Sequence, residues 1–198
     1  MRKLLFCLLA LVSQFAVAEN AKDVLDKAAA RFKAAGNVKI GFQMNANGNS
    51  TTGYIDVADS KFFCDMAGVS VWFDGSTMWH YVKANEEVNV TTPSQREVVR
   101  MNPYSFLTLY KKGYACRMGK STSAYYEVVL TGEKDAAYQS LVVRLKKGSY
   151  EPVYVKTVTK KVTTEITVNS YLTNQKFPEG TFRFNPKEFP KVEVVDLR

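Results

Sequence analysis

The stretch VSVWFDGSTMWHYVK, residues 69–83, decides the fold. Its two short apolar arms are joined through Asp74-Gly75, a dipeptide that tolerates the positive φ of a tight hairpin turn. Successive side chains of a strand point to opposite faces, yet neither face is polar, because Val71 and Phe73 alternate with Trp72. A sheet with one solvated face would carry polar residues at every second position. Apolar cover is therefore expected on both sides, either in a buried sandwich or in a curved sheet whose concave side holds an apolar ligand.

The segments that flank this hairpin also alternate with a period of two and are separated by turn residues. They predict strands at 38–46, 51–57, 61–66, 87–91, 114–118, 125–131, 140–146, 152–158 and 162–173. With the two arms of the hairpin this makes about eleven strands at an even spacing, which indicates an antiparallel meander. The closing residues 177–198 contain prolines, which keep that segment out of a central ladder.

Three helices are predicted. The first follows Asn20, a suitable N-cap, and has apolar residues at helical spacing. The second begins at Thr92-Pro93, where Gln95 completes a capping-box pattern, and it ends before Pro103. The third continues from there to Gly113 and is rich in large apolar side chains. The last two helices interrupt the meander, either as ordinary core-facing helices or as a lid over the concave face of the sheet.

Residues 1–18 are predicted to be a secretory signal peptide. Two basic residues precede an apolar run at 4–11, and Ala16-Val17-Ala18 supplies a small-x-small cleavage pattern. The apolar run is much shorter than the roughly 20 residues of a membrane-spanning helix. We expect cleavage after residue 18, an exported soluble protein, and a single domain over residues 19–198.

The basic balance of the chain is modest once that segment is removed. Loss of Arg2 and Lys3 lowers the formal net charge from +8 to +6. Much of the excess lies in the pairs Lys111-Lys112, Lys146-Lys147 and Lys160-Lys161, at predicted turns or helix ends, which is typical of a solvated surface that protects sheet edges. Export argues against a nucleic-acid partner, whereas a weak attraction to anionic lipid headgroups or to an acidic partner stays open.

Residues with catalytic or metal-binding potential are few. His80 is the only histidine and lies mid-strand, with no carboxylate or nucleophile placed to work with it, and Asp74 is explained as a turn residue by its glycine neighbour. Cys64 and Cys116 could pair in an oxidising compartment or remain two buried thiols. There is no metal-ligand cluster, phosphate loop or nucleophile motif in the sequence. We expect a binding protein without cofactor or metal rather than an enzyme.

The hairpin segment FDGSTMWHY (73–81), the helical insertion after Thr92-Pro93 and the closing FRFNP…VEVVDL (182–197) together resemble the LolA family of periplasmic lipoprotein carriers. The resemblance implies an α+β fold, in which a strongly curved antiparallel sheet forms an incomplete β-barrel. An N-terminal helix accompanies the sheet, and a two-helix lid closes its open side. The resemblance also implies a monomeric periplasmic carrier that takes the acyl chains of lipoproteins from an inner-membrane transporter to an outer-membrane acceptor.

On this resemblance, the inward positions of the strands predict the wall of a hydrophobic cavity: Val38, Ile40, Phe42, Met44, Phe62, Val71, Phe73 and Met78. The predicted lid residues are Phe106, Leu109 and Tyr110. A slip of one residue in register would exchange the two faces of any strand.

One feature of such carriers is missing. They often have an arginine-proline pair just after the second strand, where the arginine ties the lid shut, and Val57-Ala58-Asp59 occupies that place here. Control of the lid must therefore differ, or the cargo is another lipid-like molecule. An alternative of the same fold is a binding or sensor module for lipid or lipoprotein in the cell envelope, without a transport role.

Overall fold

The computed structural model describes residues 19–102 and 106–198, apart from the side chain of Phe106. Its twelve strands form one open sheet in the order β12-β6-β5-β4-β3-β2-β1-β11-β10-β9-β8-β7, antiparallel except for the parallel pair β12–β6. The strands are β1 Val38–Ala46, β2 Asn49–Ala58, β3 Lys61–Met66, β4 Val69–Phe73, β5 Met78–Val82, β6 Glu87–Thr91, β7 Tyr114–Met118, β8 Tyr125–Gly132, β9 Ser140–Lys146, β10 Pro152–Val158, β11 Thr163–Leu172 and β12 Glu193–Asp196.

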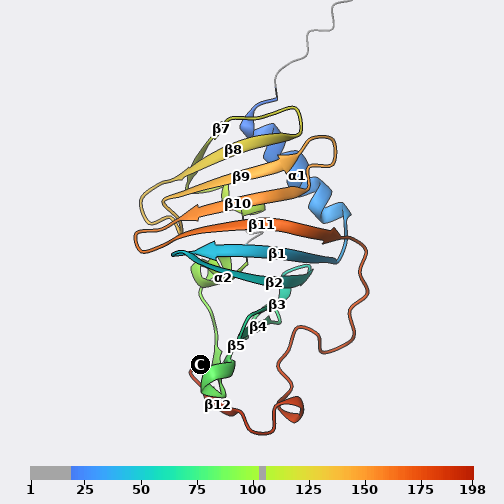
Figure 1. Ribbon diagram of the computed structural model, residues 1–198, viewed down its shortest axis with the longest axis vertical. Coiled ribbons are helices and arrows are strands. Elements are labelled where there is room, and N and C mark those ends of the chain that lie inside the picture. The colour runs from blue at the N-terminus through green and yellow to red at the C-terminus, as the bar shows by residue number, and fades with distance from the viewer. Residues whose placement is uncertain (1–18, 103–105) are drawn as a thin grey trace, which may run out of the picture.

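Three α-helices lie in the described residues: α1 Ala21–Ala34, α2 Gln95–Met101 and α3 Phe106–Leu109. Two short 3₁₀ helices, η1 Lys83–Asn85 and η2 Pro186–Glu188, occur in connections. Helix α1 lies behind β7–β10 in the view of Figure 1, and α2 lies closer to β1 and β2. Contacts of α1 with α3, β7 and β8 hold the first helix on that part of the sheet.

The sheet is curled and does not close. Figure 1 shows β7 to β11 and β1 nearly face-on, whereas β2 to β5 are turned toward edge-on. A twisted open sheet of more than about ten strands tends to curl. Irregularities add curvature, because the register shifts between Gly41 and Phe42 opposite β11, and again between Pro152 and Tyr154 opposite β9. The predicted curved antiparallel sheet is thus confirmed, with β12 as a twelfth strand.

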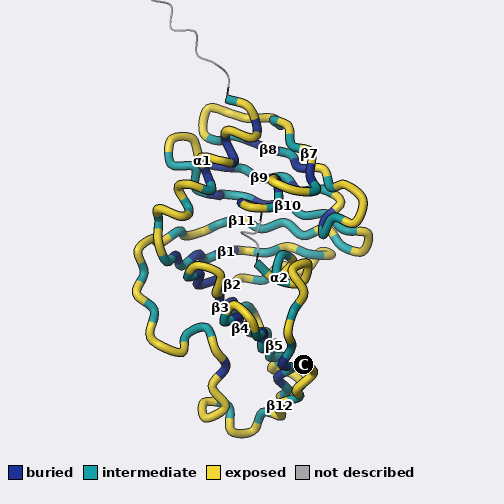
Figure 2. Tube along the Cα trace, turned by 180° about the vertical axis from the view of Figure 1, so that it is seen from behind, coloured by how far each residue is buried: buried dark blue, intermediate teal, exposed yellow. Residues whose placement is uncertain are grey.

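The core is divided between the two faces of the sheet. The larger cluster contains the buried residues of α1 and the inward side chains of most strands, among them Val71, Phe73 and Met78 of the β4–β5 hairpin. On the opposite, convex face, Trp72 packs with Val88, Val90 and Phe184. Both sides of the hairpin are therefore covered, as its sequence requires. The cover on the convex side comes from the segment 173–192 between β11 and β12, whose Phe184, Phe189 and Val192 join this cluster. In Figure 2 this irregular tail passes beside β2 to β5 on its way to β12.

Glycine and its preceding aspartate form the hairpin connection, but the turn is wider than a two-residue one. Strand β4 ends at Phe73 and β5 begins at Met78, so four residues lie between them. Gly75 has φ +102°, as expected for the position that needs a glycine. Asp74 Oδ1 accepts hydrogen bonds from the backbone N–H groups of Ser76 and Thr77. These bonds make Asp74 a structural residue of the turn.

One local prediction needs correction, and another is confirmed. Helix α2 begins later than expected: Ser94 is its N-cap, and the capping box pairs Ser94 with Glu97 instead of joining the threonine at 92 to Gln95. The tail stays out of the central ladder, as predicted: once the last proline is passed, it forms the short edge strand β12, which pairs only with β6.

The two cysteines of the described residues do not pair. Cys64 is buried and Cys116 half-buried, and both are free thiols. Burial raises the pKa of the Cys64 thiol to about 12.

The predicted signal peptide, residues 1–18, lies outside the described residues. Among the described helices, none is long and apolar enough to cross a membrane.

Candidate functional site: an apolar hollow beneath helix α2

An apolar hollow of about 610 Å³ lies on the concave face of the sheet. Its volume falls within the roughly 300–1,000 Å³ that is usual for sites that bind small molecules. The apolar side chains that line it are Phe42, Met44, Cys64, Met66, Met101, Ala136, Ala137, Tyr138, Leu141, Val162 and Ile166. The strands that contribute are β1, β3, β9, β10 and β11, together with helix α2 and the β8–β9 and β10–β11 connections.

Strand pairing brings the floor of the hollow together from distant parts of the sequence. Met44 of β1 is paired with Ile166 of β11, so two residues more than a hundred positions apart lie side by side. Gly53 of β2 lets the floor be compact: a Cβ there would lie 2.4 Å from the Asp65 carbonyl oxygen and 3.1 Å from Cζ of Phe42. A larger residue at this position would clash with the Asp65 carbonyl oxygen and with Cβ of Met66, and it would press on the Phe42 ring.

Helix α2 and the β8–β9 connection form the roof, and hydrogen bonds join them. Tyr138 is buried, and its hydroxyl lies 3.3 Å from the carbonyl oxygen of Val99, to which it donates. In return, Arg96 donates to the carbonyl of Ala136 at 3.2 Å, and Arg100 lies 3.5 Å from that of residue 137. Burial raises the pKa of Tyr138 to about 12, so it remains a donor at neutral pH. The roof is thus fixed by polar contacts around its edge while its inner surface stays apolar.

The charges that line the hollow have one sign. Arg96 and Arg100 come from α2, and Lys160 and Lys161 come from the β10–β11 connection. No aspartate or glutamate belongs to the lining in the part of the chain that the structure describes. The hollow is therefore an apolar space with a basic margin.

Two of the eight predicted wall residues line this hollow, Phe42 and Met44. The other six are buried in the same concave-face cluster without reaching the hollow: Val38, Ile40, Phe62, Val71, Phe73 and Met78. All eight belong to or pack against the one cluster on the concave side. Their part in ligand binding stays a prediction.

The predicted lid residues lie elsewhere. Tyr110 is buried, and its hydroxyl donates a hydrogen bond to Oδ1 of Asp26 in α1. Leu109 is half-buried against the main cluster, and the side chain of Phe106 is outside the described part of the chain. Helix α3 is therefore attached to α1, and among the described residues it is α2 that borders the hollow.

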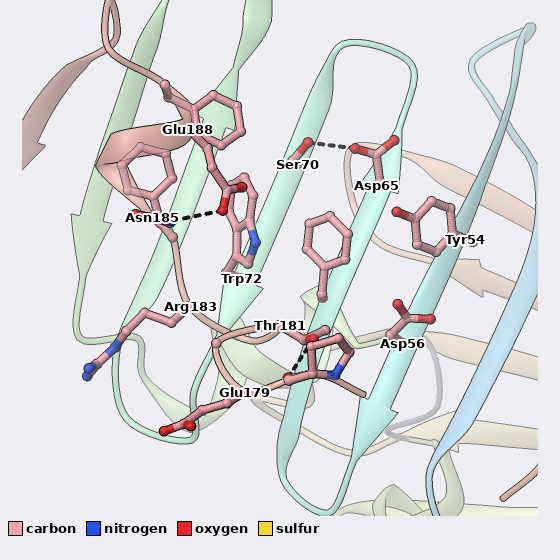
Figure 3. Close-up of a pocket in the computed structure, with 15 residues that line it drawn as sticks. Tyr54, Asp56, Asp65, Ser70, Trp72, Glu179, Thr181, Arg183, Asn185 and Glu188 are labelled. Carbon is pink, nitrogen blue, oxygen red and sulfur yellow. Dashed lines mark hydrogen bonds between the residues drawn. The ribbon is translucent and has the colours of Figure 1, made fainter. Parts of the chain in front are cut away.

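A second crevice, of about 680 Å³, lies on the convex face between β2–β4 and the tail (Figure 3). A row of aromatic rings forms its floor, with ring centroids 5.8 Å apart for Tyr54 and Phe63 and 5.1 Å apart for Phe63 and Trp72. Phe184 of the tail continues the row, 5.5 Å from Trp72. This crevice is the space left where the tail packs on the sheet.

Carboxylates make the convex crevice unsuitable for hydrocarbon. Asp56, Asp65, Glu179 and Glu188 line it. Burial raises the pKa of Asp56 above its usual value, although the Lys39 ammonium, 3.1 Å from Oδ1, opposes that effect. An apolar chain placed here would strip water from charged groups without replacing it. The concave hollow is therefore the better candidate site.

No group of three or more histidine, cysteine, aspartate or glutamate side chains is placed to hold a metal ion in the part of the chain that the structure describes. His80 sits in the middle of β5, paired with Val71 and Asn89 across the neighbouring strands.

Sequence reasoning missed most of the lining. Cys64 and Met66 share the face of Phe62 by simple alternation and could have been found from it. Ile166 and Leu141 could not, because their proximity to β1 depends on the β1–β11 pairing, which no local pattern encodes. Lys160-Lys161 was predicted as plain solvated surface, whereas the structure places both lysines at the hollow.

Comparison with known proteins gives a consistent result. The model of a family described as "Outer membrane lipoprotein carrier protein LolA" matches residues 11–161. No curated protein matches the chain. An uncharacterized conserved protein from Thermus thermophilus is similar in structure, with a TM-score of 0.63, 10% sequence identity, and coverage of 89% of this chain and 98% of that one.

Two further solved structures are less similar. A putative outer membrane lipoprotein-sorting protein domain from Vibrio parahaemolyticus has a TM-score of 0.45 at 15% identity, covering 86% of this chain and 99% of that one. The Mycobacterium tuberculosis lipoprotein LppX has a TM-score of 0.44 at 13% identity, covering 79% and 98%.

Proposed function

The chain belongs to the LolA family of outer membrane lipoprotein carrier proteins, and from this premise we propose that it binds the acyl chains of lipoproteins in the concave hollow and carries them across the periplasm. The observation that carries the proposal is the apolar hollow beneath α2, lined by side chains from both halves of one curled sheet. The carrier role includes an inner-membrane transporter as donor and an outer-membrane acceptor. It involves no catalytic step.

Hydrophobic transfer supplies enough free energy for such binding. Each methylene moved from water into an apolar site contributes about 0.8 kcal/mol. About ten buried methylenes would therefore contribute about 8 kcal/mol before the entropic cost of binding is subtracted. Three methionines line the hollow, Met44, Met66 and Met101. Their unbranched side chains can adjust to chains of different length, which suits a carrier with varied cargo.

A charge placed in the hollow tests this proposal. Met44 faces the hollow and is half-buried, whereas Gln43 is exposed on the opposite face of the same strand. We expect Met44→Glu to weaken the binding of a fluorescent fatty acid to residues 19–198 at least tenfold, because the carboxylate would be desolvated by the bound chain. Gln43→Glu adds the same charge and should leave the affinity unchanged. Equal affinities of the two variants would place the acyl chain elsewhere.

Transport requires a second measurement. A carrier loaded with an acylated lipoprotein should release it to acceptor outer-membrane vesicles, and the transferred lipoprotein would be detected in the vesicle fraction. Retention of the lipoprotein, together with co-purification of a protein partner, would favour the sensor or binding module instead.

A further inference from the structure

We propose that the hollow selects amphiphiles whose headgroup is anionic, with the apolar chain beneath α2 and the negative charge among Arg96, Arg100, Lys160 and Lys161. This inference rests on the proposed function, because it assigns the second half of the ligand in the same site. Its basis is the contrast between an apolar lining and a margin that holds four cations and, in the described part of the chain, no carboxylate.

The four cations come from two neighbouring parts of the lining of the hollow. Arg96 and Arg100 are four residues apart on α2 and therefore lie on one face of that helix. The β8–β9 connection links them to the end of β10, since residue 139 donates a backbone hydrogen bond to the carbonyl of Val158 at 2.8 Å. Lys160 and Lys161 follow immediately in the β10–β11 connection. In Figure 1 the β10–β11 turn is at the left end of its strands, and α2 lies toward that end of the sheet.

Among the described residues, these four cations form no ion pair with a carboxylate. The ion pairs in that part of the chain involve other lysines and arginines, such as Lys39 with Asp56 and Arg144 with Glu127. Each guanidinium has five N–H donors, and the contacts of Arg96 and Arg100 with backbone carbonyls engage only part of them. Glu97, between the two arginines on α2, is bound by Ser94, and the charge of Arg100 helps to lower its pKa. An anion among the four cations would relieve the repulsion that remains between them.

The convex crevice shows that the positive charge is not spread evenly over the molecule. The convex crevice is lined by four carboxylates, and its single arginine, Arg183, is paired with Asp74 at 3.1 Å. A uniformly basic surface would give the hollow and the convex crevice the same sign of charge. The positive charge is instead gathered where an amphiphile in the hollow would present its headgroup. Phosphate and carboxylate groups are the anions that guanidinium and ammonium groups bind with charge-assisted hydrogen bonds.

Two ligands with the same acyl chain and different headgroups separate the contribution of the headgroup to affinity from that of the chain. Oleoyl lysophosphatidic acid and monooleoylglycerol would each compete with a fluorescent fatty acid for residues 19–198 at near-physiological salt. We expect the phosphate-bearing lipid to bind about tenfold more tightly or better, as hydrogen bonds to charged groups allow. Glycerol phosphate, which has the headgroup without the chain, should not compete in the same concentration range.

Variants that remove lysine charges test whether the preference for the anionic lipid arises at the hollow. Lys160→Gln combined with Lys161→Gln should reduce the preference for the anionic lipid by about tenfold and leave the affinity for monooleoylglycerol unchanged. The matched control is Lys146→Gln with Lys147→Gln, which removes the same charge at the β9–β10 connection, where Lys147 lies over the Tyr126 ring, 5.0 Å from its centroid. The control should keep the preference of the wild type.

Each contrary result has a distinct meaning. Equal binding of the two lipids would overturn the headgroup inference and leave the acyl-chain proposal intact. Binding of neither lipid would overturn both. Competition by glycerol phosphate at the concentration of the full lipid would show a site for free phosphate and contradict the amphiphile assignment. Equal loss of preference in both lysine pairs would show a general charge effect and overturn the site.

Discussion

Removal of the Phe184 side chain is the sharpest test of why the tail crosses the convex face. Phe184 is 5% exposed and packs edge-on against Trp72, with 5.5 Å between ring centroids, and against Phe189 at 5.1 Å. Truncation of a buried phenylalanine to alanine costs about 3–5 kcal/mol. Because the tail is irregular and can move inward over the space, we expect Phe184→Ala to lower the free energy of unfolding by about 3 kcal/mol.

Urea unfolding of residues 19–198, followed by tryptophan fluorescence, would measure this loss. Trp72 is itself 7% exposed, so its emission should shift to the red in the folded variant as water reaches the ring. Phe182→Ala is the matched control, since Phe182 is half-buried and its ring contact is with Phe177 of the tail. We expect a loss of about 1 kcal/mol or less for the control.

The two variants together decide whether the hairpin needs cover on both faces. If Phe184→Ala is no more destabilising than Phe182→Ala, and the emission of Trp72 does not change, the tail does not stabilise the sheet. The conclusion that the hairpin needs cover on its convex face would then be wrong. Binding of a fluorescent fatty acid should survive in both variants, because the hollow lies on the opposite face.

Three other predictions concern stability and reactivity. Gly53→Ala should lower the free energy of unfolding by about 2 kcal/mol in urea titrations, since its Cβ would lie within 3 Å of two neighbouring atoms. The pKa of Glu127 lies below its usual 4.5, because a hydrogen bond from Arg144 outweighs the effect of burial. The ionised Glu127 carboxylate therefore stabilises the fold fully above about pH 4.5, and this contribution is lost as the pH falls through the lower folded-state pKa. The difference in free energy of unfolding between wild type and Glu127→Gln should narrow only in that acidic range. With a thiol reagent at mildly alkaline pH, Cys116 should react fast in the native protein and Cys64 only on unfolding, because Cys64 is buried and its pKa is about 12.

Local patterns were sufficient for most of the fold. Alternation placed β1 at Val38–Ala46 and identified both arms of the hairpin, although four residues, not two, separate them. The absence of a polar face around Trp72 correctly required cover on both sides of the hairpin. What covers the second face could not be predicted, because the contact between Trp72 and Phe184 joins residues more than a hundred positions apart.

The site was less accessible to sequence reasoning, for a related reason. The hollow forms where β1 meets β11, and that pairing depends on the path of the whole sheet instead of any neighbouring turn. The predicted wall residues are inward-facing, but alternation does not distinguish a side chain that reaches the hollow, such as Met44, from one packed beneath it, such as Ile40. Paired lysines at a turn also look alike in sequence whether they face bulk solvent or the margin of a cavity.

The central claim is that an acyl chain occupies the concave hollow beneath α2. A crystal structure of residues 19–198 with a fatty acid brominated near its methyl end would test it most directly, through the anomalous signal of the bromine. The expected result is a bromine peak among Met44, Leu141 and Ile166. A peak in the convex crevice beside Trp72, or no bromine signal in the hollow at saturating fatty acid, would contradict it.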